Sequence, residues 1–166
     1  LCFALEETGA LFTGDHVMGA DQLCGRSLRM MAEDLPRLGI ATSLVDATDA
    51  KAVAEAIRPE TRLVLIEVVS NPTIRIADLD AVAEVCAERG VLLVVDNTFT
   101  TPLGIRPFEH GADIVLHSVT KLLAGHSDAT LGWVAAKDPA LANLGRREQD
   151  TIKQISSLYG LLANIL

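Results

Sequence analysis

Lys121 and Asp96 are the two residues of this chain whose positions most clearly suggest chemistry. Lys121 follows two hydroxyl residues, Ser118 and Thr120, just after one apolar run, and Asp96 ends another run, 91–95. A lysine amine forms an imine with an aldehyde, and a carboxylate can hold a proton on a pyridine nitrogen so that the ring accepts electrons. Hydroxyls beside the lysine can donate to a phosphate. These groups together match the needs of one cofactor, pyridoxal phosphate (PLP).

Lys121 also has a simpler interpretation as a solvated surface side chain, because lysine is mostly exposed in proteins. In an extended segment, Ser118 and Thr120 point to the same side, so both hydroxyls can meet one anion. A buried lysine also loses its proton more readily, which favours imine formation. The pattern alone leaves the surface role and the cofactor role open.

Asp96 needs a partner if it is buried, because burying an unpaired charge costs several kcal/mol. It can cap a following turn with the help of Asn97 and Thr98. It can also pair with a protonated pyridine nitrogen or bind a metal. The metal interpretation is weaker, since no carboxylate or histidine pair lies nearby at a ligand spacing.

Asn71 and Glu67 form a third polar group in the chain. Asn71 precedes Pro72, and Asn-Pro is a common turn. The alternative is that the Asn71 amide donates a hydrogen bond to the ring oxygen of the cofactor. Glu67 lies in the strand before this turn and is either a partner or a buried acid without an assigned role.

Alternating strands and helices predict an α/β fold with a mostly parallel sheet and helices on both faces. Continuous apolar runs such as 91–95 are typical of strands covered on both sides. Strands are expected over 39–45, 62–69, 91–95, 114–116 and 131–136, and helices over 49–58, 78–89, from 138 onward and over 151–166. Ligands of such sheets bind outside the carboxyl ends of the strands. The polar groups 70–71, 96–98 and 118–121 are therefore expected to open onto one crevice.

Composition narrows the range of partners. The formal net charge is −8, which argues against nucleic acid or an anionic membrane as a partner. No apolar stretch approaches the roughly 20 residues of a membrane span. The three cysteines are scattered and lack a CxxC spacing, so reduced thiols in a cytoplasmic protein are expected. The chain does not begin with methionine and shows no leader, so a fragment is expected.

Two blocks carry a resemblance to a known family. The segments Val94–Pro102 and Gly111–Lys121 resemble the signature of the Cys/Met-metabolism PLP enzymes, and Gly125–Asp128 continues it. This family includes cystathionine γ-synthases, cystathionine lyases, methionine γ-lyases and homoserine-ester sulfhydrylases. Further similarity lies in Gly14–Val17, Asp34–Ile40 and Glu67–Pro72, so the match runs across nearly the whole chain.

The resemblance implies a role for each matching residue. Lys121 would form the Schiff base, Asp96 would pair with the pyridine nitrogen, and Asn71 would contact the ring oxygen. Ser118 and Thr120 would hold the phosphate. The family's fold is an aspartate-aminotransferase-like (fold type I) large domain with a smaller C-terminal domain. The family usually forms homotetramers, as dimers of dimers with active sites at dimer interfaces.

The chain departs from the family pattern at Cys24. The family usually has a tyrosine here, which stacks on the cofactor ring, and a thiol supplies neither that area nor a phenol. The family's glycine-rich phosphate loop and its carboxylate-binding arginine would lie beyond the two ends. Residues 1–166 are therefore expected to be the central part of the large domain, with the C-terminal small domain absent.

The resemblance implies a PLP-dependent transsulfuration enzyme that eliminates or replaces a group at the β or γ carbon of sulfur amino acids or homoserine esters. The expected partner is a small amino-acid substrate, and the segment alone is expected to be inactive. One alternative is a catalytically impaired relative that serves as a structural subunit, because of Cys24. A second is another doubly wound enzyme that uses Asp96 for a metal.

Overall fold

The protein forms one six-stranded sheet in the order β2-β1-β3-β4-β5-β6. The structure is a computed structural model that describes residues 11–126, 128 and 130–139. The strands are β1 (His16–Ala20), β2 (Ala41–Val45), β3 (Thr61–Glu67), β4 (Leu92–Asp96), β5 (Ile114–Ser118) and β6 (Gly132–Ala136). The pairs from β2 through β5 are parallel, and β6 pairs with β5 in the antiparallel direction.

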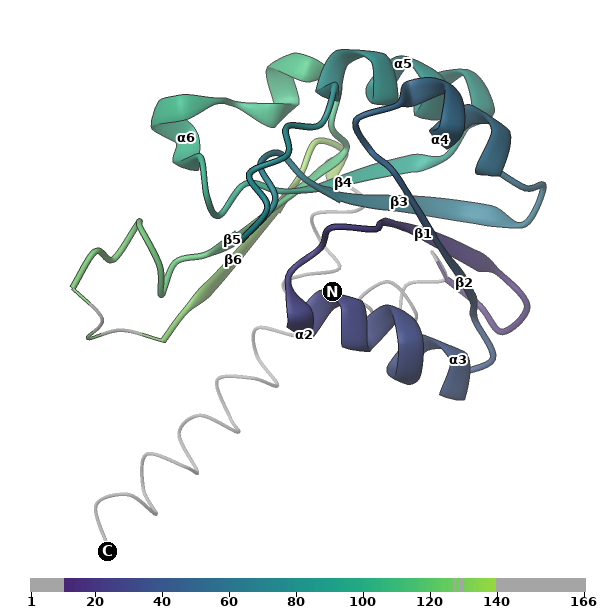
Figure 1. Ribbon diagram of the computed structural model, residues 1–166, viewed down its shortest axis with the longest axis horizontal. Coiled ribbons are helices and arrows are strands. Elements are labelled where there is room, and N and C mark those ends of the chain that lie inside the picture. The colour runs from purple at the N-terminus through teal and green to yellow at the C-terminus, as the bar shows by residue number, and fades with distance from the viewer. Residues whose placement is uncertain (1–10, 127, 129, 140–166) are drawn as a thin grey trace, which may run out of the picture.

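Helices cover both faces of this sheet (Figure 1). On one face lies a continuous helical segment made of α2 (Gly25–Arg29), the π-helical turn η1 (Met30–Asp34) and α3 (Leu35–Arg37). On the other face lie α4 (Ala50–Ala56), α5 (Leu79–Arg89), α6 (Thr101–Gly104) and the 3-10 turn η2 (Pro107–His110). The predicted mostly parallel α/β sheet is confirmed.

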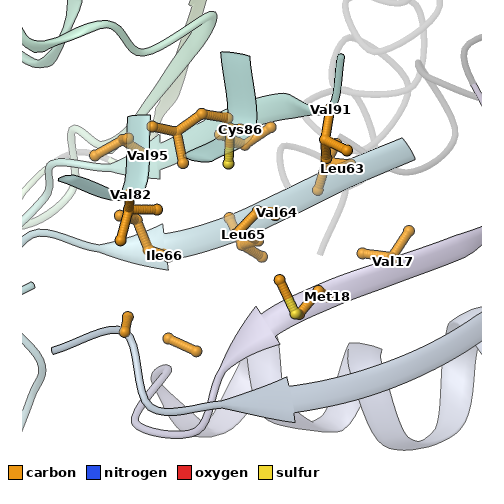
Figure 2. Close-up of a cluster of buried hydrophobic side chains, with 14 of the residues drawn as sticks. Val17, Met18, Leu63, Val64, Leu65, Ile66, Val82, Cys86, Val91 and Val95 are labelled. Atoms are coloured by element: carbon orange, nitrogen blue, oxygen red, sulfur yellow. The ribbon is translucent and has the colours of Figure 1, made fainter. Parts of the chain in front are cut away.

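The core lies between β3, β4 and the helices on the two faces (Figure 2). Val64, Ile66 and Leu93 are fully buried in the sheet, and Val82 of α5 packs on the same cluster. Leu63 and Leu65, which alternate with Val64 and Ile66 along β3 and point to the opposite face, are buried as well. Burial on both sheet faces explains why the strand reads as an unbroken apolar run. Truncating a buried aliphatic residue to alanine costs about 2–5 kcal/mol, so this core holds the strand ends in place.

Helix α5 shows how local sequence sets an element. Asp78 accepts a hydrogen bond from Ala81 N at 3.2 Å and so caps the first turn. Gly90 ends the helix in the left-handed conformation, with φ 64°. Cys86, on the apolar side, is buried, and that burial raises the pKa of its thiol to about 12. It is a packing residue.

The expected strands and the helices over 49–58 and 78–89 are confirmed, with small shifts at the ends. The sequence interpretation missed β1 and the whole helical segment from α2 to α3. Gly19 in β1 explains part of this, since glycine is unusual in a strand interior. A Cβ there would meet Leu23 Cδ1 and Met31 Cε at 3.0 Å, so the glycine allows the helical segment to approach. The helix predicted over 151–166 lies outside the described residues.

Within the residues that the structure describes, no helix is both long and apolar enough to cross a membrane.

Candidate active site

A cleft of about 660 Å³ lies at the carboxyl ends of β3, β4 and β5. Its size falls in the range of small-molecule and cofactor sites, about 300–1,000 Å³. The lining residues are Cys24, Arg26, Ser27, Glu67, Val69, Asn71, Asp96, Thr98, Phe99, Ser118, Lys121 and Leu122. The predicted convergence of three polar groups on one crevice is therefore observed.

Asp96 lies half-buried at the end of β4. Thr98 N donates to Asp96 Oδ1 at 2.9 Å, and Ser118 N donates to Thr98 Oγ1 at 2.8 Å. These bonds connect the end of β4 to the end of β5 beside it. Among the described residues Asp96 has no cationic partner, so its negative charge remains available to a ligand in the cleft.

Lys121 lies in a turn directly after β5. Lys121 N donates to Ser118 O at 3.1 Å and Gly125 N donates to Lys121 O at 3.0 Å, so the backbone of this turn is held on both sides. Within the described part of the chain, the side chains of Lys121, Ser118 and Asn71 make no hydrogen bond. All three line the cleft and are free to contact a bound molecule.

Thr120 departs from the expected geometry. Its hydroxyl donates to Leu131 O at 3.2 Å and accepts from Leu131 N at 2.9 Å, and it does not line the cleft. The prediction that Ser118 and Thr120 lie in one extended segment is wrong, because β5 ends at Ser118 and a turn follows. A phosphate role for Thr120 stays a prediction.

Cys24 and Glu67 form a direct contact between the helical segment and the sheet. Cys24 N donates to Glu67 Oε1 at 2.7 Å, and Cys24 Sγ lies 3.4 Å from Ser27 Oγ. Burial raises the pKa of Glu67, the Cys24 amide opposes that shift, and the negative charge of Asp96 adds to it. Sequence analysis left Glu67 without a role; it lines the cleft beside Asp96.

His117, which directly precedes Ser118 in the sequence, is buried and does not line the cleft. Its ring lies 5.4 Å from that of Trp133 on β6, at 52°. Burial lowers the pKa of His117. Its Nδ1 has no hydrogen-bond partner in the described part of the chain. His117 is thus a packed residue that contacts Trp133 and does not line the cleft.

Several lining residues carried no sequence signal. Arg26 and Phe99 line the cleft, and both are exposed. An arginine or a phenylalanine on its own is not diagnostic, and only the folded chain brings these two side chains to the same cleft. Among the described residues, no group of three or more His, Cys, Asp and Glu lies close enough to hold a metal ion.

The donor set fits PLP by its chemistry. Lys121, Asp96, Asn71 and Ser118 bring an amine, a carboxylate, an amide and a hydroxyl to a single cleft. Among the described residues Asp96 has no cationic partner, and the side chains of Asn71 and Ser118 make no hydrogen bond. These are the groups that an aldehyde, a protonated ring nitrogen, a ring oxygen and a phosphate require. A doubly wound sheet with a cofactor-sized cleft at its carboxyl edge defines the class as an α/β protein that binds a cofactor at the strand ends.

Comparison with known proteins identifies the family. The model of the family "Cys/Met metabolism PLP-dependent enzyme" matches residues 5–158. The chain belongs to this family, whose enzymes depend on PLP and have fold type I. The resemblance that the sequence blocks carried is confirmed.

The relatives that the chain matches include cystathionine lyases and a methionine lyase. The chain is 47% identical to cystathionine beta-lyase MetC of Bacillus subtilis over 131 residues, which cover 79% of this chain and 34% of that protein. It is 46% identical to cystathionine gamma-lyase of the same organism, over 78% of this chain and 34% of that protein. It is 41% identical to L-methionine gamma-lyase of Porphyromonas gingivalis, over 75% of this chain and 32% of that protein. The chain spans about a third of the length of these relatives.

Proposed function

We propose that the full-length protein is a PLP-dependent transsulfuration enzyme. It would eliminate or replace a group at the β or γ carbon of a sulfur amino acid or a homoserine ester. The observation that carries this proposal is that Lys121, Asp96, Asn71 and Ser118 line one cleft at the carboxyl edge. The activities named for the relatives support the same reaction class.

Each residue of the site has a proposed task. When bound, PLP supplies an electron sink for the carbanion at the substrate's α carbon. Lys121 would hold the cofactor through Nζ and would carry protons at that atom between substrate carbons. Asp96 keeps a proton on the ring nitrogen, Asn71 donates to the ring oxygen, and Ser118 donates to the phosphate.

The test uses the full-length protein and its Lys121→Ala variant. We expect the variant to lose the visible absorbance band of the bound cofactor and turnover of cystathionine, because the attaching amine is gone. Lys51→Ala is the control, since Lys51 lies on the exposed side of α4 and pairs with Glu55 at 3.8 Å. An unchanged visible band in Lys121→Ala would contradict the role of Lys121.

A second candidate function is a catalytically impaired subunit. Cys24 supports it, because this residue lines the cleft where the family usually presents a tyrosine ring. Turnover of cystathionine, methionine and an acylated homoserine by the wild-type full-length protein separates the two candidates. If the cofactor binds but none of the three is consumed, and Cys24→Tyr restores turnover, the impaired-subunit proposal holds.

We further propose that residues 1–166 form the central part of a large PLP domain. The partial coverage of the relatives supports this boundary. We also propose a homotetramer, a dimer of dimers, and a cytoplasmic location. The assembly is supported by Leu103, which is 99% exposed here and would be covered at a subunit interface. The cytoplasmic location is supported by Cys24 and Cys86, which are free thiols. Light scattering of the full-length protein tests the assembly.

A further inference from the structure

Glu67 is a half-buried acid of the cleft that the proposed function does not use. It is the last residue of β3, and its neighbour in the parallel register is Asp96, the last residue of β4. Both side chains line the same cleft. Two acids therefore lie next to each other on adjacent strand ends, and only one is needed for the ring nitrogen.

The hydrogen bonds of the two acids differ. Asp96 Oδ1 accepts from Thr98 N, in the loop that follows its own strand. Glu67 Oε1 accepts from Cys24 N at 2.7 Å, and Cys24 lies 43 positions away on the segment that leads into α2. The Glu67 bond therefore joins distant parts of the chain, whereas the Asp96 bond is local. Desolvation and the neighbouring charge of Asp96 also disfavour a second anion at this point.

We propose that Glu67 is a positioning residue, which holds the Cys24 backbone and thereby sets the cleft wall 24–27 against the strand ends. Cys24, Arg26 and Ser27 all belong to that wall. The inference rests on the proposed function insofar as the wall faces the cofactor. Cys24 Sγ lies 3.4 Å from Ser27 Oγ within the same wall, and the bond from the Cys24 amide to Glu67 joins that wall to the sheet.

The role needs an acceptor oxygen and does not need a negative charge. A glutamine at position 67 keeps one acceptor oxygen at nearly the same place, whereas alanine removes it and leaves the partly buried Cys24 amide without this partner. Glu67→Gln and Glu67→Ala therefore separate positioning from charge. Glu88→Ala serves as the matched control, because Glu88 lies exposed on α5.

The experiment uses full-length protein and two readouts. The first is the affinity for PLP from an absorbance titration, where we expect Glu67→Ala to bind about tenfold more weakly and Glu67→Gln to stay within about twofold of wild type. The second is amide hydrogen exchange over residues 21–28 without cofactor. There we expect Glu67→Ala alone to exchange about tenfold faster.

Each outcome decides the proposal. Equal losses in Glu67→Gln and Glu67→Ala would show that the charge matters and would overturn positioning. Wild-type behaviour of Glu67→Ala in both readouts would overturn it as well. If Glu67→Ala does not fold, Glu67→Gln decides alone, because a loss of protection over 21–28 in that variant contradicts the proposal. If wild type does not bind PLP, the proposed function fails, and hydrogen exchange still tests the Glu67 bond.

Discussion

The two halves of the carboxyl edge use their polar residues in opposite ways. At the ends of β1 and β2, Arg75 forms ion pairs with Asp46 and Asp21, and the Arg75–Asp21 distance is 3.8 Å. Arg75 also donates a hydrogen bond to the Thr48 hydroxyl at 3.1 Å. At the ends of β3, β4 and β5, the described side chains of Asn71, Ser118 and Lys121 have no hydrogen-bond partner within the protein. We call the half around Arg75, Asp46 and Asp21 the closed half, because its polar side chains bond to one another. We call the half around Asn71, Ser118 and Lys121 the open half, because these side chains are available to a ligand.

The same short loop connects the two halves. This loop is held by a bond between the hydroxyls of Ser70 and Thr73 and by the bond from Thr73 to Gln22 at 2.7 Å. The ion pairs of Arg75 hold it as well. Asn71 lies within this loop but faces the cleft. Polar groups that satisfy one another keep the loop in place, and polar groups left without partners are the ones available to a ligand. Residues that pair with one another at this edge therefore serve stability, and residues without partners there are available for binding.

The largest effect is expected from Asp96→Ala in the open half. Removing the only acid proposed to pair with the ring nitrogen should weaken PLP binding by about 100-fold, since breaking a partly buried charge pair costs several kcal/mol. The full-length variant would be titrated with PLP and assayed on cystathionine. Asp80→Ala on α5 is the control, because Asp80 is exposed and pairs with His110 outside the cleft. A wild-type affinity for PLP in Asp96→Ala would contradict the proposed role of Asp96 in binding the cofactor.

A smaller effect is expected from Asn71→Ala. The loss of one amide hydrogen bond to the bound cofactor should weaken PLP binding by about tenfold while the unfolding midpoint stays near that of wild type. The reason is that the Asn71 side chain makes no hydrogen bond within the described protein. Absorbance titration and thermal unfolding measure the two quantities. A large drop in the unfolding midpoint would show that Asn71 stabilises the fold and is not reserved for the ligand.

Arg75→Ala tests the closed half and should show the reverse pattern. Its ion pairs with Asp46 and Asp21 are lost, so the unfolding midpoint should fall slightly, in keeping with exposed ion pairs. PLP binding should weaken less than in Asn71→Ala. Thermal unfolding and PLP titration of the same preparation would show this. If Arg75→Ala weakened PLP binding as much as Asn71→Ala does and left the unfolding midpoint at the wild-type value, the closed half would also serve the ligand.

The smallest effect concerns acid pH. The hydroxyl and backbone of Thr48, together with Arg75, lower the pKa of Asp46 from 3.8 to about 2. A lowered pKa contributes stability that is present above the unfolded value and is lost as pH falls through the folded value. The difference in unfolding midpoint between wild type and Asp46→Asn should thus persist above about pH 4 and vanish towards pH 2. A difference that grows on acidification would contradict the assignment.

The sequence predicted the central strands well, for physical reasons visible in the structure. β3 and β4 are buried on both faces, so their residues form continuous apolar runs that need no knowledge of the partners. Asp78 and Gly90 likewise mark the ends of α5 through local caps. β1 was missed because its burial depends on the segment that packs on Gly19, which no local pattern reveals.

For the site, the sequence determined which chemical groups are present at the ends of the strands, including Lys121, Asp96, Asn71 and Ser118. Strand ends are local features, and parallel strands place their carboxyl ends at one edge, so convergence could be inferred in advance. Tertiary structure alone decided that Thr120 bonds to Leu131 and that Glu67 holds Cys24. Those contacts join residues 11 and 43 positions apart, and their geometry depends on how turns and helices pack around the sheet.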